Sequence, residues 1–349
     1  TMLTRPSPQV SLCMPHLNSG GFVYERMRSI VSQTLRDWEL IIVDSASTDG
    51  SLEVLEQYAA SDPRIRIHQA PRDGIYSNIN RAIGMSWGCF VYLATSDDTM
   101  VSDCLESMVA ALEAHPECGF AHCCLTIIDE EGHALVGPDS WENYESQRHF
   151  GDWLRKSHVR RAPHDGLLHF RHFTVFTSLT QLLVRRELYR RLGAFRTDRS
   201  SFADFEWEMK ASLVENVVHV PRALATWRRH GRQATKGNML VRARAAGEFV
   251  AMARAALSWL SLERPVIAHA VRDRGMLRYY LYDQLEACQA LAGSPAERRR
   301  AVCSFCVREP EFALALFRRR LLKIFGVHRS ASIDDDIRAL MPEGGLVEA

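Results

Sequence analysis

The stretch WELIIVDSASTDGSLEVLEQYAA, residues 38–60, joins a strand-like run to a helix-like run. Its first part is apolar and rich in β-branched residues, which is typical of a buried strand, and it ends in the carboxylate of Asp44. Ser47 or Thr48 can cap the helix that follows, and Asp49 then lies near the positive end of the helix dipole. The stretch therefore predicts one strand-and-helix unit of a larger sheet.

The same alternation continues on both sides of this unit. Further strands are predicted over residues 10–15, 64–70, 89–95 and 119–128, and further helices over residues 22–35, 75–85 and 103–115. Alternation of this kind argues for an α/β fold with a doubly wound, mainly parallel sheet flanked by helices. In such sheets, ligands bind beyond the carboxyl ends of the strands.

The composition of the chain changes at two places after these strands and helices. Residues 137–175 are polar and rich in Trp, His and Arg, so we expect a long loop with short helices that forms a substrate-facing flap. A strand and a helix are predicted over residues 179–195, a helix over 202–215 and an extended segment over 217–230. Long Ala, Leu and Arg helices follow. We therefore expect an α/β domain over residues 1–236 and a helical C-terminal appendage over residues 237–349.

Charge and cysteine content narrow the classes of partner and compartment. Lys+Arg 43 against Asp+Glu 42 leaves no overall field to attract nucleic acid, so no nucleic-acid partner is expected. The 9 cysteines show no disulfide spacing, which favours a reducing compartment. The sequence has neither a secretory leader pattern nor an apolar run of about 18 residues. These features predict a cytoplasmic protein.

Two adjacent carboxylates, Asp97 and Asp98, close a predicted strand in FVYLATSDDTM, residues 90–100. Asp44 and Asp73 follow two other strands, and the carboxyl ends of parallel strands share one edge of a sheet. Carboxylates gathered there require a cation or a hydrogen-bonding ligand such as a ribose or a base. Oxygen ligands suit Mg²⁺ or Mn²⁺. Alternatively, Asp97 caps the next helix and Asp98 is solvated.

Several segments, in order over about residues 8–236, together resemble the inverting family 2 glycosyltransferases, which have the GT-A fold. They are VSLCMPHLNSG, RSIVSQTLRDWELIIVDSASTDGS, RDGIYSNINRAIG, GCFVYLATSDDTM, LLVRRELYRRLGAF, FADFEWEMK and PRALATWRRHGRQAT. The third and fourth segments resemble a branch of the family with D-x-G-I-Y and S-D-D motifs. The residues after about 238 lie outside the resemblance.

The resemblance implies a set of donor-binding residues. These are Pro15, Leu17 and Asn18 under the base, Asp44 on the base or ribose, Asp73 and Asn80 beside the nucleotide or donor sugar, and Asp97 on the ribose. In this chain Leu17 replaces an aromatic residue often found in the family, so base stacking should be weaker. Ser45 likewise stands where the family often has an acidic residue or glycine.

The resemblance also implies the catalytic and metal-binding residues. Asp98 is the expected metal ligand, and His230 falls where a His or Arg meets the metal or the diphosphate. Asp204 falls where the family has its catalytic base. Ala203 departs from the family, which usually has a carboxylate before the base. Glu206 could serve as the base if the register were different.

These roles imply a metal-dependent, inverting glycosyltransferase that uses Mn²⁺ or Mg²⁺. It would move a hexose or N-acetylhexosamine from a nucleotide donor, UDP by preference, to a hydroxyl of a glycan or lipid-linked acceptor. One alternative is a sugar-phosphate nucleotidyltransferase, but the loop PHLNSGGF lacks the basic residue that such enzymes normally carry there. Another is a non-catalytic nucleotide-sugar binder, in which Ala203 marks decay of the site.

The basic, amphipathic run LFRRRLLKIFGVHR, residues 316–329, has two interpretations. It is either a solvated face over an apolar stripe or a peripheral contact with anionic lipid at the inner face of a membrane. Because many relatives in the family use lipid-linked acceptors, the second interpretation stays open.

Overall fold

The computed structural model describes residues 7–137, 145–172, 175–198, 202–231, 239–314, 317 and 346–348. Its strands are β1 (Val10–His16), β2 (Trp38–Asp44), β3 (Ile65–Gln69), β4 (Phe90–Leu93), β5 (Cys118–Ile128), β6 (His158–Arg160), β7 (Leu182–Arg185), β8 (Asn216–Arg228) and β9 (Leu346–Glu348). Its α-helices are α1 (Val23–Val31), α2 (Ser51–Ser61), α3 (Ile75–Gly84), α4 (Cys104–Ala114), α5 (Glu145–Phe150), α6 (His164–His172), α7 (Arg186–Leu192), α8 (Ala203–Val214), α9 (Met239–Glu263), α10 (Pro265–Asp273), α11 (Arg278–Ala290) and α12 (Pro295–Arg308). Short 3₁₀ helices are η3 (Gly151–Arg155) and η4 (Leu179–Gln181).

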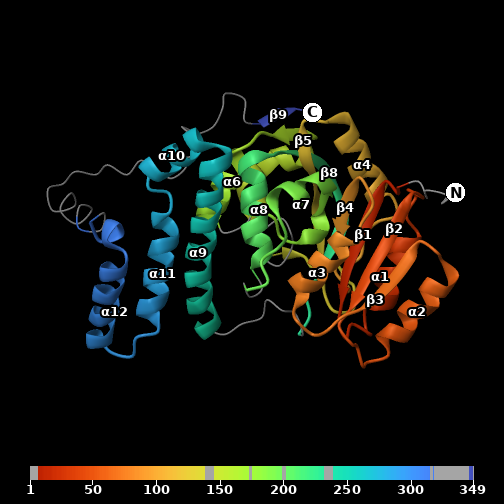
Figure 1. Ribbon diagram of the computed structural model, residues 1–349, viewed down its shortest axis with the longest axis horizontal. Helices are drawn as coiled ribbons and strands as arrows, with labels where there is room; N and C mark the ends of the chain where they lie inside the picture. Colours follow the sequence, from red (N-terminus) through yellow and green to blue (C-terminus); the bar gives the residue numbers. More distant parts are fainter. Residues whose placement is uncertain are drawn as a thin grey trace.

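The described strands form a nine-stranded sheet in the order β3-β2-β1-β4-β7-β5-β8-β6-β9. β1 pairs in parallel with β2 and β4, β2 pairs in parallel with β3, and β5 pairs in parallel with β8. β7 and β6 are each antiparallel to both of their neighbours. The sheet is therefore mixed but mostly parallel, and helices flank it (Figure 1). This confirms the predicted fold class.

The first strands of the sheet are apolar because they lie in the middle of the fold. Every residue of β1 is buried, and in β2 Glu39 is the one residue that is partly exposed. α3 packs against both strands. The register pairs His16 with Asp44 and Cys13 with Leu93, so β1, β2 and β4 end close together. This is the edge of the sheet beyond which the sequence predicts that ligands bind.

The predicted helix over residues 47–60 starts later than expected. α2 begins at Ser51, and its N-cap is Gly50, whose φ of 84° is the left-handed conformation that glycine adopts most readily. Ser47 is not the cap because its hydroxyl donates to Asp44, and Thr48 binds Asn18 through its backbone. The two residues predicted as the cap, Ser47 and Thr48, therefore hold the preceding loop together and do not cap the helix.

The expected flap over residues 137–175 is more structured than a loop. It contains α5, η3, β6 and α6 among its described residues, and residues 138–144 and 173–174 lie outside them. α6 packs against α8, and its Leu167 and Phe170 are buried in the core. β6, which the sequence did not predict, pairs with β8. Much of this segment therefore supports the sheet.

The C-terminal region is helical, as expected. α9 packs against α8, α11 packs against α9 and α6, and α12 packs against α11. In Figure 1, α9, α11 and α12 stand at the opposite end of the molecule from β1, β2 and β3. No helix in the described part of the chain has the length and apolar character needed to cross a bilayer. The run 316–329 falls outside the described residues, apart from residue 317.

Candidate active site

A cavity of about 540 Å³ opens beyond the carboxyl ends of β1, β2 and β4. Its walls come from the loops after these strands, from the segment that enters α3, and from the end of β8. Its lining residues include Pro15, His16, Leu17, Asn18, Phe22, Ser45, Arg72, Gly74, Ile75, Asn78, Thr95, Asp97, Asp98, Trp227 and His230. The sheet thus brings segments that are distant in the sequence to the edge where ligands were expected.

The loops after β1 and β2 are fastened to each other by hydrogen bonds. The backbone N–H of Asn18 donates to Ser47 Oγ at 3.0 Å, and that of Thr48 donates to Asn18 Oδ1 at 2.8 Å. Asn18 has a φ of 49°, a conformation that asparagine tolerates better than most residues. Asp44 is fully buried and accepts hydrogen bonds from the backbone and hydroxyl of Ser47. In this structure, Asp44 stabilises the loop and does not line the cavity.

Apolar and polar groups alternate in the entrance of the cavity. Leu17 and Ile75 are 45% and 47% exposed at its lining, an unusual exposure for large aliphatic side chains. Pro15 is buried, and its carbonyl accepts from Ser96 Oγ at 2.9 Å. Arg72 lines the same cavity and donates to the carbonyls of the loop after β2, including that of Ser45 at 3.1 Å. The predicted base-binding loop is therefore rigidly held.

The pair Asp97 and Asp98 lies on the cavity together with His230. Asp98 is buried, and its two oxygens accept from Thr95 Oγ1 and, at 2.7 Å, from the backbone N–H of Arg228. Burial, and next the charge of Asp97, raise the pKa of Asp98 to about 7. The side chain of Asp97 is 27% exposed, and its Oδ2 lies 2.9 Å from His230 Nε2. The structure thus brings both predicted metal ligands to one cavity.

Arg228 holds this arrangement in place. Its guanidinium donates to the carbonyl of Asp97 at 2.8 Å and to that of Glu130 at 2.9 Å, and it also pairs with Glu25. It lies over the ring of Phe22, 5.0 Å from the ring centroid. Because Arg228 is buried and its donors point to these groups, it positions the carboxylate loop.

Asp204 stands in the first turn of α8, partly buried, and it is not among the lining residues of the cavity. Its Oδ1 accepts from the hydroxyl of Tyr76 and from the backbone N–H of Phe205, both at 2.9 Å. Burial raises the pKa of Asp204 to about 6, although these two hydrogen bonds act in the opposite direction. A carboxyl group with this pKa is suited to take up a proton near neutral pH.

Besides Asp44, two more of the predicted donor-binding residues lie outside the lining of the cavity. Asp73 is exposed and forms an ion pair with Arg81 on α3. Asn80 exchanges hydrogen bonds with the backbone of Phe195, at 2.8 and 2.9 Å, and faces a separate hollow of about 290 Å³. Their proposed contacts with the donor stay predictions. In this structure both side chains are engaged with other protein groups.

The residues on the cavity fit a divalent cation. Asp97 and Asp98 offer carboxylate oxygens and His230 an imidazole nitrogen, which are ligands that Mn²⁺ and Mg²⁺ sites use. Two neighbouring carboxylates, one buried with a raised pKa, are destabilised by their mutual repulsion, and a cation would relieve it. The site chemistry therefore agrees with the predicted cofactor, without identifying the metal.

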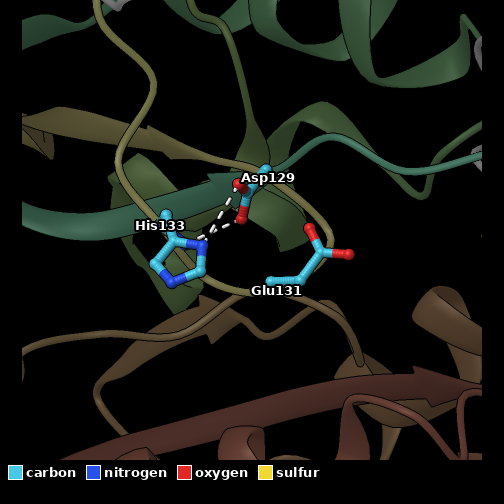
Figure 2. Close-up of side chains that lie close together, drawn as sticks. All are labelled: Asp129, Glu131 and His133. Atoms are coloured by element: carbon cyan, nitrogen blue, oxygen red, sulfur yellow. Dashed lines mark hydrogen bonds and ion pairs between the residues drawn. The ribbon is translucent and has the colours of Figure 1, made fainter.

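A second group of possible ligands lies on the turn after β5. Ligand atoms of Asp129, Glu131 and His133 all lie within 4.8 Å of one another (Figure 2). His133 Nδ1 is 3.4 Å from Asp129 Oδ2, and the side chain of His133 is 80% exposed. No pattern in the sequence had indicated this group. Exposed acidic groups of this kind are common without a bound ion.

Sequence reasoning also missed His16 and Tyr76. His16 is buried beneath the cavity, with Nδ1 3.0 Å from Ser96 Oγ and Nε2 2.8 Å from Ser51 Oγ. Burial lowers the pKa of His16. A signal was available for both residues: His16 follows Pro15 in the base-binding loop, and Tyr76 ends the D-x-G-I-Y motif.

Comparison with known proteins agrees with this geometry. Residues 11–174 match the family model described as "Glycosyl transferase family 2". Chondroitin synthase of Escherichia coli is 27% identical over 40% of this chain and 21% of its own length. The chain spans about a fifth to about half of the length of several curated relatives that it matches.

Two solved structures share the fold. TarS of S. aureus in complex with UDP-GlcNAc has a TM-score of 0.53 at 14% identity, covering 89% of this chain and 92% of TarS. The mannosyltransferase PcManGT of Pyrobaculum calidifontis, in complex with GDP-Man and Mn2+, has a TM-score of 0.51 at 19% identity, covering 90% and 85%. Residues 11–174 are thus similar to the family 2 glycosyltransferase model, and the two solved structures show that the chain shares their fold.

Proposed function

We propose that the protein is a metal-dependent, inverting glycosyltransferase that moves a hexose or N-acetylhexosamine from a nucleotide donor to an acceptor hydroxyl. The observation that carries this proposal is the convergence of Asp97, Asp98 and His230 on one cavity at the carboxyl edge of the sheet. The acceptor in this proposal is a glycan or a lipid-linked saccharide. The family match of residues 11–174 supports the reaction class.

The cavity is proposed to bind the nucleotide diphosphate part of the donor. Leu17 and Ile75 would contact the faces of the base at the entrance, and Asn18 holds the loop beside it. UDP is the preferred nucleotide because TarS, a structural neighbour, has been solved with UDP-GlcNAc. A neighbour solved with GDP-Man makes GDP the competing choice.

Asp98 and His230 would hold Mn²⁺ or Mg²⁺, and Asp97 would contact the ribose. When bound, the cation supplies Lewis-acid stabilisation of the charge on the leaving diphosphate. Asp97 and His230 keep each other in place through their 2.9 Å contact. The backbone N–H of Arg228 orients the carboxylate of Asp98 from the other side.

Asp204 is proposed as the general base. The acceptor O–H gives its proton to the carboxylate while the acceptor oxygen forms a bond to the anomeric carbon of the donor sugar. The bond from that carbon to the diphosphate oxygen breaks, and its electron pair leaves with the nucleoside diphosphate. A single displacement of this kind inverts the configuration at the anomeric carbon. Because the pKa of Asp204 is raised only to about 6, the carboxylate is ionised at neutral pH.

The proposal is tested by thermal unfolding in a panel of UDP- and GDP-sugars, with and without Mn²⁺. We expect one UDP-sugar to raise the Tm when Mn²⁺ is present, because a ligand that binds the native state stabilises it. Asp98→Ala should abolish the metal-dependent part of this shift. Asp273→Ala, which removes an exposed aspartate of α10, is the matched control and should keep it.

Turnover is measured on the same panel as release of nucleoside diphosphate in the presence of Mn²⁺ or Mg²⁺. Release that depends on the metal and disappears in Asp98→Ala supports transferase chemistry. An equal response to every nucleotide, with and without metal, would show that the cavity does not act as a donor site. Donor binding without any release would support the non-catalytic binder instead.

A further inference from the structure

The phenol of Tyr76 makes direct contact with the proposed base. Its hydroxyl donates a hydrogen bond of 2.9 Å to Asp204 Oδ1, and the two residues are 128 positions apart in the sequence. Tyr76 is buried in the first turn of α3, while Asp204 lies in the first turn of α8. The start of one helix is therefore linked to the start of another across the fold.

We propose that Tyr76 is a positioning residue for transfer: it holds Oδ1 of Asp204 and thereby presents Oδ2 to the acceptor hydroxyl as the proton-accepting atom. This inference rests on the proposed function of Asp204. Oδ1 accepts from both Tyr76 and the backbone N–H of Phe205. Within the described part of the chain, both hydrogen bonds recorded for this carboxylate go to Oδ1.

The ring of Tyr76 is fixed by an aromatic stack behind it. It stacks on Phe195 with centroids 5.8 Å apart and ring planes at 25°. Phe195 is held in turn by Asn80, which exchanges two hydrogen bonds with its backbone. Trp207 on α8 lies 5.5 Å from Phe195. The phenol therefore cannot swing away without disturbing the packing between α3 and α8, which makes the hydrogen bond a lasting constraint.

The same helix also contributes to the donor cavity. Gly74, Ile75 and Asn78 line the cavity on either side of Tyr76 in the sequence. Gly74 has a φ of 104°, a backbone conformation that other residues rarely adopt, so the turn into α3 depends on glycine. One rigid element thus carries the wall of the donor site and the partner of the base. α3 thereby links the proposed donor site to the proposed base.

The hydrogen bond from Tyr76 can be tested experimentally because it changes the pKa of Asp204. Burial raises the pKa of Asp204 to about 6, and the donation by Tyr76 is the largest effect that lowers it. Two other carboxylates share its helix: Glu206 pairs with Lys210 at 2.7 Å, and Glu208 is buried. Burial, then the charge of Asp204, and to a smaller extent that of Glu208 raise the pKa of Tyr76. Tyr76 therefore stays protonated and remains a donor. Removing its hydroxyl must raise the pKa of the base.

The test compares Tyr76→Phe with the parent protein over a range of pH, at saturating donor and Mn²⁺. In the parent, the acid limb of the pH profile of kcat should lie near pH 6. In Tyr76→Phe it should move up by about one pH unit, because a hydrogen bond that favours the carboxylate is lost. We expect kcat at the optimum to fall about tenfold, with KM for the donor changed less than about twofold.

Tyr189→Phe is the matched control. Tyr189 is a buried phenol in the same aromatic stack, 4.5 Å from Trp207 and 5.9 Å from Phe195, but its hydroxyl makes no recorded contact with Asp204. Its pH profile should match that of the parent. An unmoved acid limb in a folded Tyr76→Phe enzyme would overturn the positioning role. So would an equal shift in Tyr189→Phe.

Asp204→Asn separates this inference from the proposed function. If this variant retains transfer, Asp204 is not the base and both ideas fail. If it loses transfer while Tyr76→Phe keeps the parent profile, the base is correct and the positioning role is wrong. Should Tyr76→Phe fail to fold, 3-fluorotyrosine at this position keeps the ring and strengthens the donor. The acid limb must then move to lower pH, and a limb that stays in place would contradict the proposal.

Discussion

Asp98 and Asp73 both follow strands of the parallel half of the sheet, yet they occupy opposite environments. Asp98 is buried on the cavity with a pKa raised to about 7 by burial and by Asp97. Asp73 is exposed, and the hydrogen bond from Arg81 holds its pKa below the usual range. The sequence gives the two residues the same local pattern. Burial and neighbouring charges set the pKa of each carboxylate, and of the two only Asp98 lines the cavity where a metal would bind.

Arg26 gives a testable case at the same scale. It is fully buried on α1, and none of its guanidinium nitrogens has a hydrogen-bond partner among the described residues. Its guanidinium carbon lies 5.7 Å from the ring centroid of Tyr92. A buried cation without hydrogen bonds is costly, because it has lost its hydration. We expect Arg26→Met to raise the free energy of unfolding by about 1–4 kcal/mol.

Urea unfolding followed by tryptophan fluorescence measures this change. Arg28→Met is the control, because Arg28 is exposed on the same helix and its replacement should change stability by less than about 0.5 kcal/mol. A loss of stability in Arg26→Met would show that the guanidinium is compensated by charge. Asp98 is a buried carboxylate on which Arg26 acts, since the charge of Arg26 lowers its pKa.

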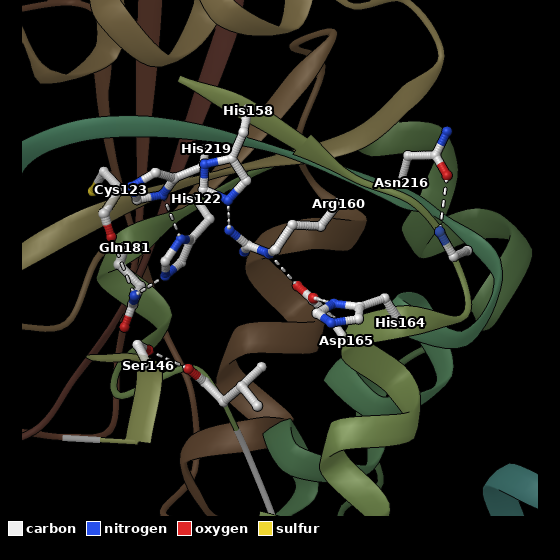
Figure 3. A network of polar contacts seen from close by, with 12 residues as sticks. His122, Cys123, Ser146, His158, Arg160, His164, Asp165, Gln181, Asn216 and His219 are labelled. Carbon is white, nitrogen blue, oxygen red and sulfur yellow. Dashed lines mark hydrogen bonds and ion pairs between the residues drawn. The ribbon is translucent and has the colours of Figure 1, made fainter. Parts of the chain in front are cut away.

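At the scale of elements, β5, β6 and β8 enclose a network of histidines (Figure 3). The Nδ1 atoms of His122 and His219 lie 2.9 Å apart. His158 Nε2 lies 3.2 Å from Arg160 Nη1. Arg160 pairs with Asp165 at 2.7 Å. All three histidines are fully buried. Alternation alone predicted β5 and the extended segment of β8, but not that polar side chains from both would meet inside the fold.

This network contributes a loss of stability as pH falls below about 6.5, which opposes the gain that protonation of Asp98 and Asp204, whose pKa values are raised, contributes over the same range. Burial lowers the pKa of His158 to about 4 and that of His219 to about 3, and it lowers the pKa of His122 well below its usual value. Below about pH 6.5 the unfolded chain binds protons that the folded chain does not. The histidine contribution to the free energy of unfolding should therefore drop by up to about 1.4 kcal/mol per histidine for each pH unit between about 6.5 and the folded pKa.

Urea unfolding at pH 7.5 and pH 5.5 tests the histidine network. His219→Gln should weaken the pH dependence, whereas His269→Gln, which changes an exposed histidine of α10, should leave it unchanged. Asp165 contributes in the same direction, but its pKa is lowered by Arg160, so its effect lies at still lower pH. A His219→Gln variant with the same pH dependence as the parent would contradict the prediction.

The elements also show where sequence reasoning worked. Strands β1 to β5 and helices α1 to α4 lie where alternation placed them, apart from the later start of α2, because their apolar runs are long enough to show a clear period. β6 and β9 have three residues each and were not predicted. A run of three residues is too short to show an alternation of apolar and polar side chains. Its pairing depends on partners such as β8 that are distant in the sequence.

At the scale of the whole molecule, the helical region is joined to the α/β unit by direct packing. Phe249 of α9 lies 4.8 Å from Phe202 and 6.0 Å from Phe205, ring centroid to ring centroid. Phe202 and Phe205 flank Asp204 in the sequence. Tyr280 of α11 also donates a hydrogen bond to the carbonyl of His169 on α6. The appendage predicted over residues 237–349 therefore supports the helix that carries the proposed base.

This packing predicts that both parts unfold together. Phe249→Ala should lower the free energy of unfolding by about 2–3 kcal/mol, because it removes a partly buried aromatic ring between α8 and α9. Leu262→Ala, on the same helix but 84% exposed, should change it by less than about 0.5 kcal/mol. Far-ultraviolet circular dichroism and tryptophan fluorescence should give one coincident transition. Two separate transitions would show that the helical region is an independent unit.

The sequence by itself determined the α/β class, the order of the first strands and helices, and the carboxylates at the carboxyl edge of the sheet. These features follow from local periodicity and from the rule that parallel strands end on one side. The tertiary structure alone decided that Asp44 and Asn80 bind other protein groups, that Asp97 meets His230, and that Tyr76 reaches Asp204. The reason is physical: such contacts join side chains that many intervening residues separate, so only the packing of whole elements brings them together.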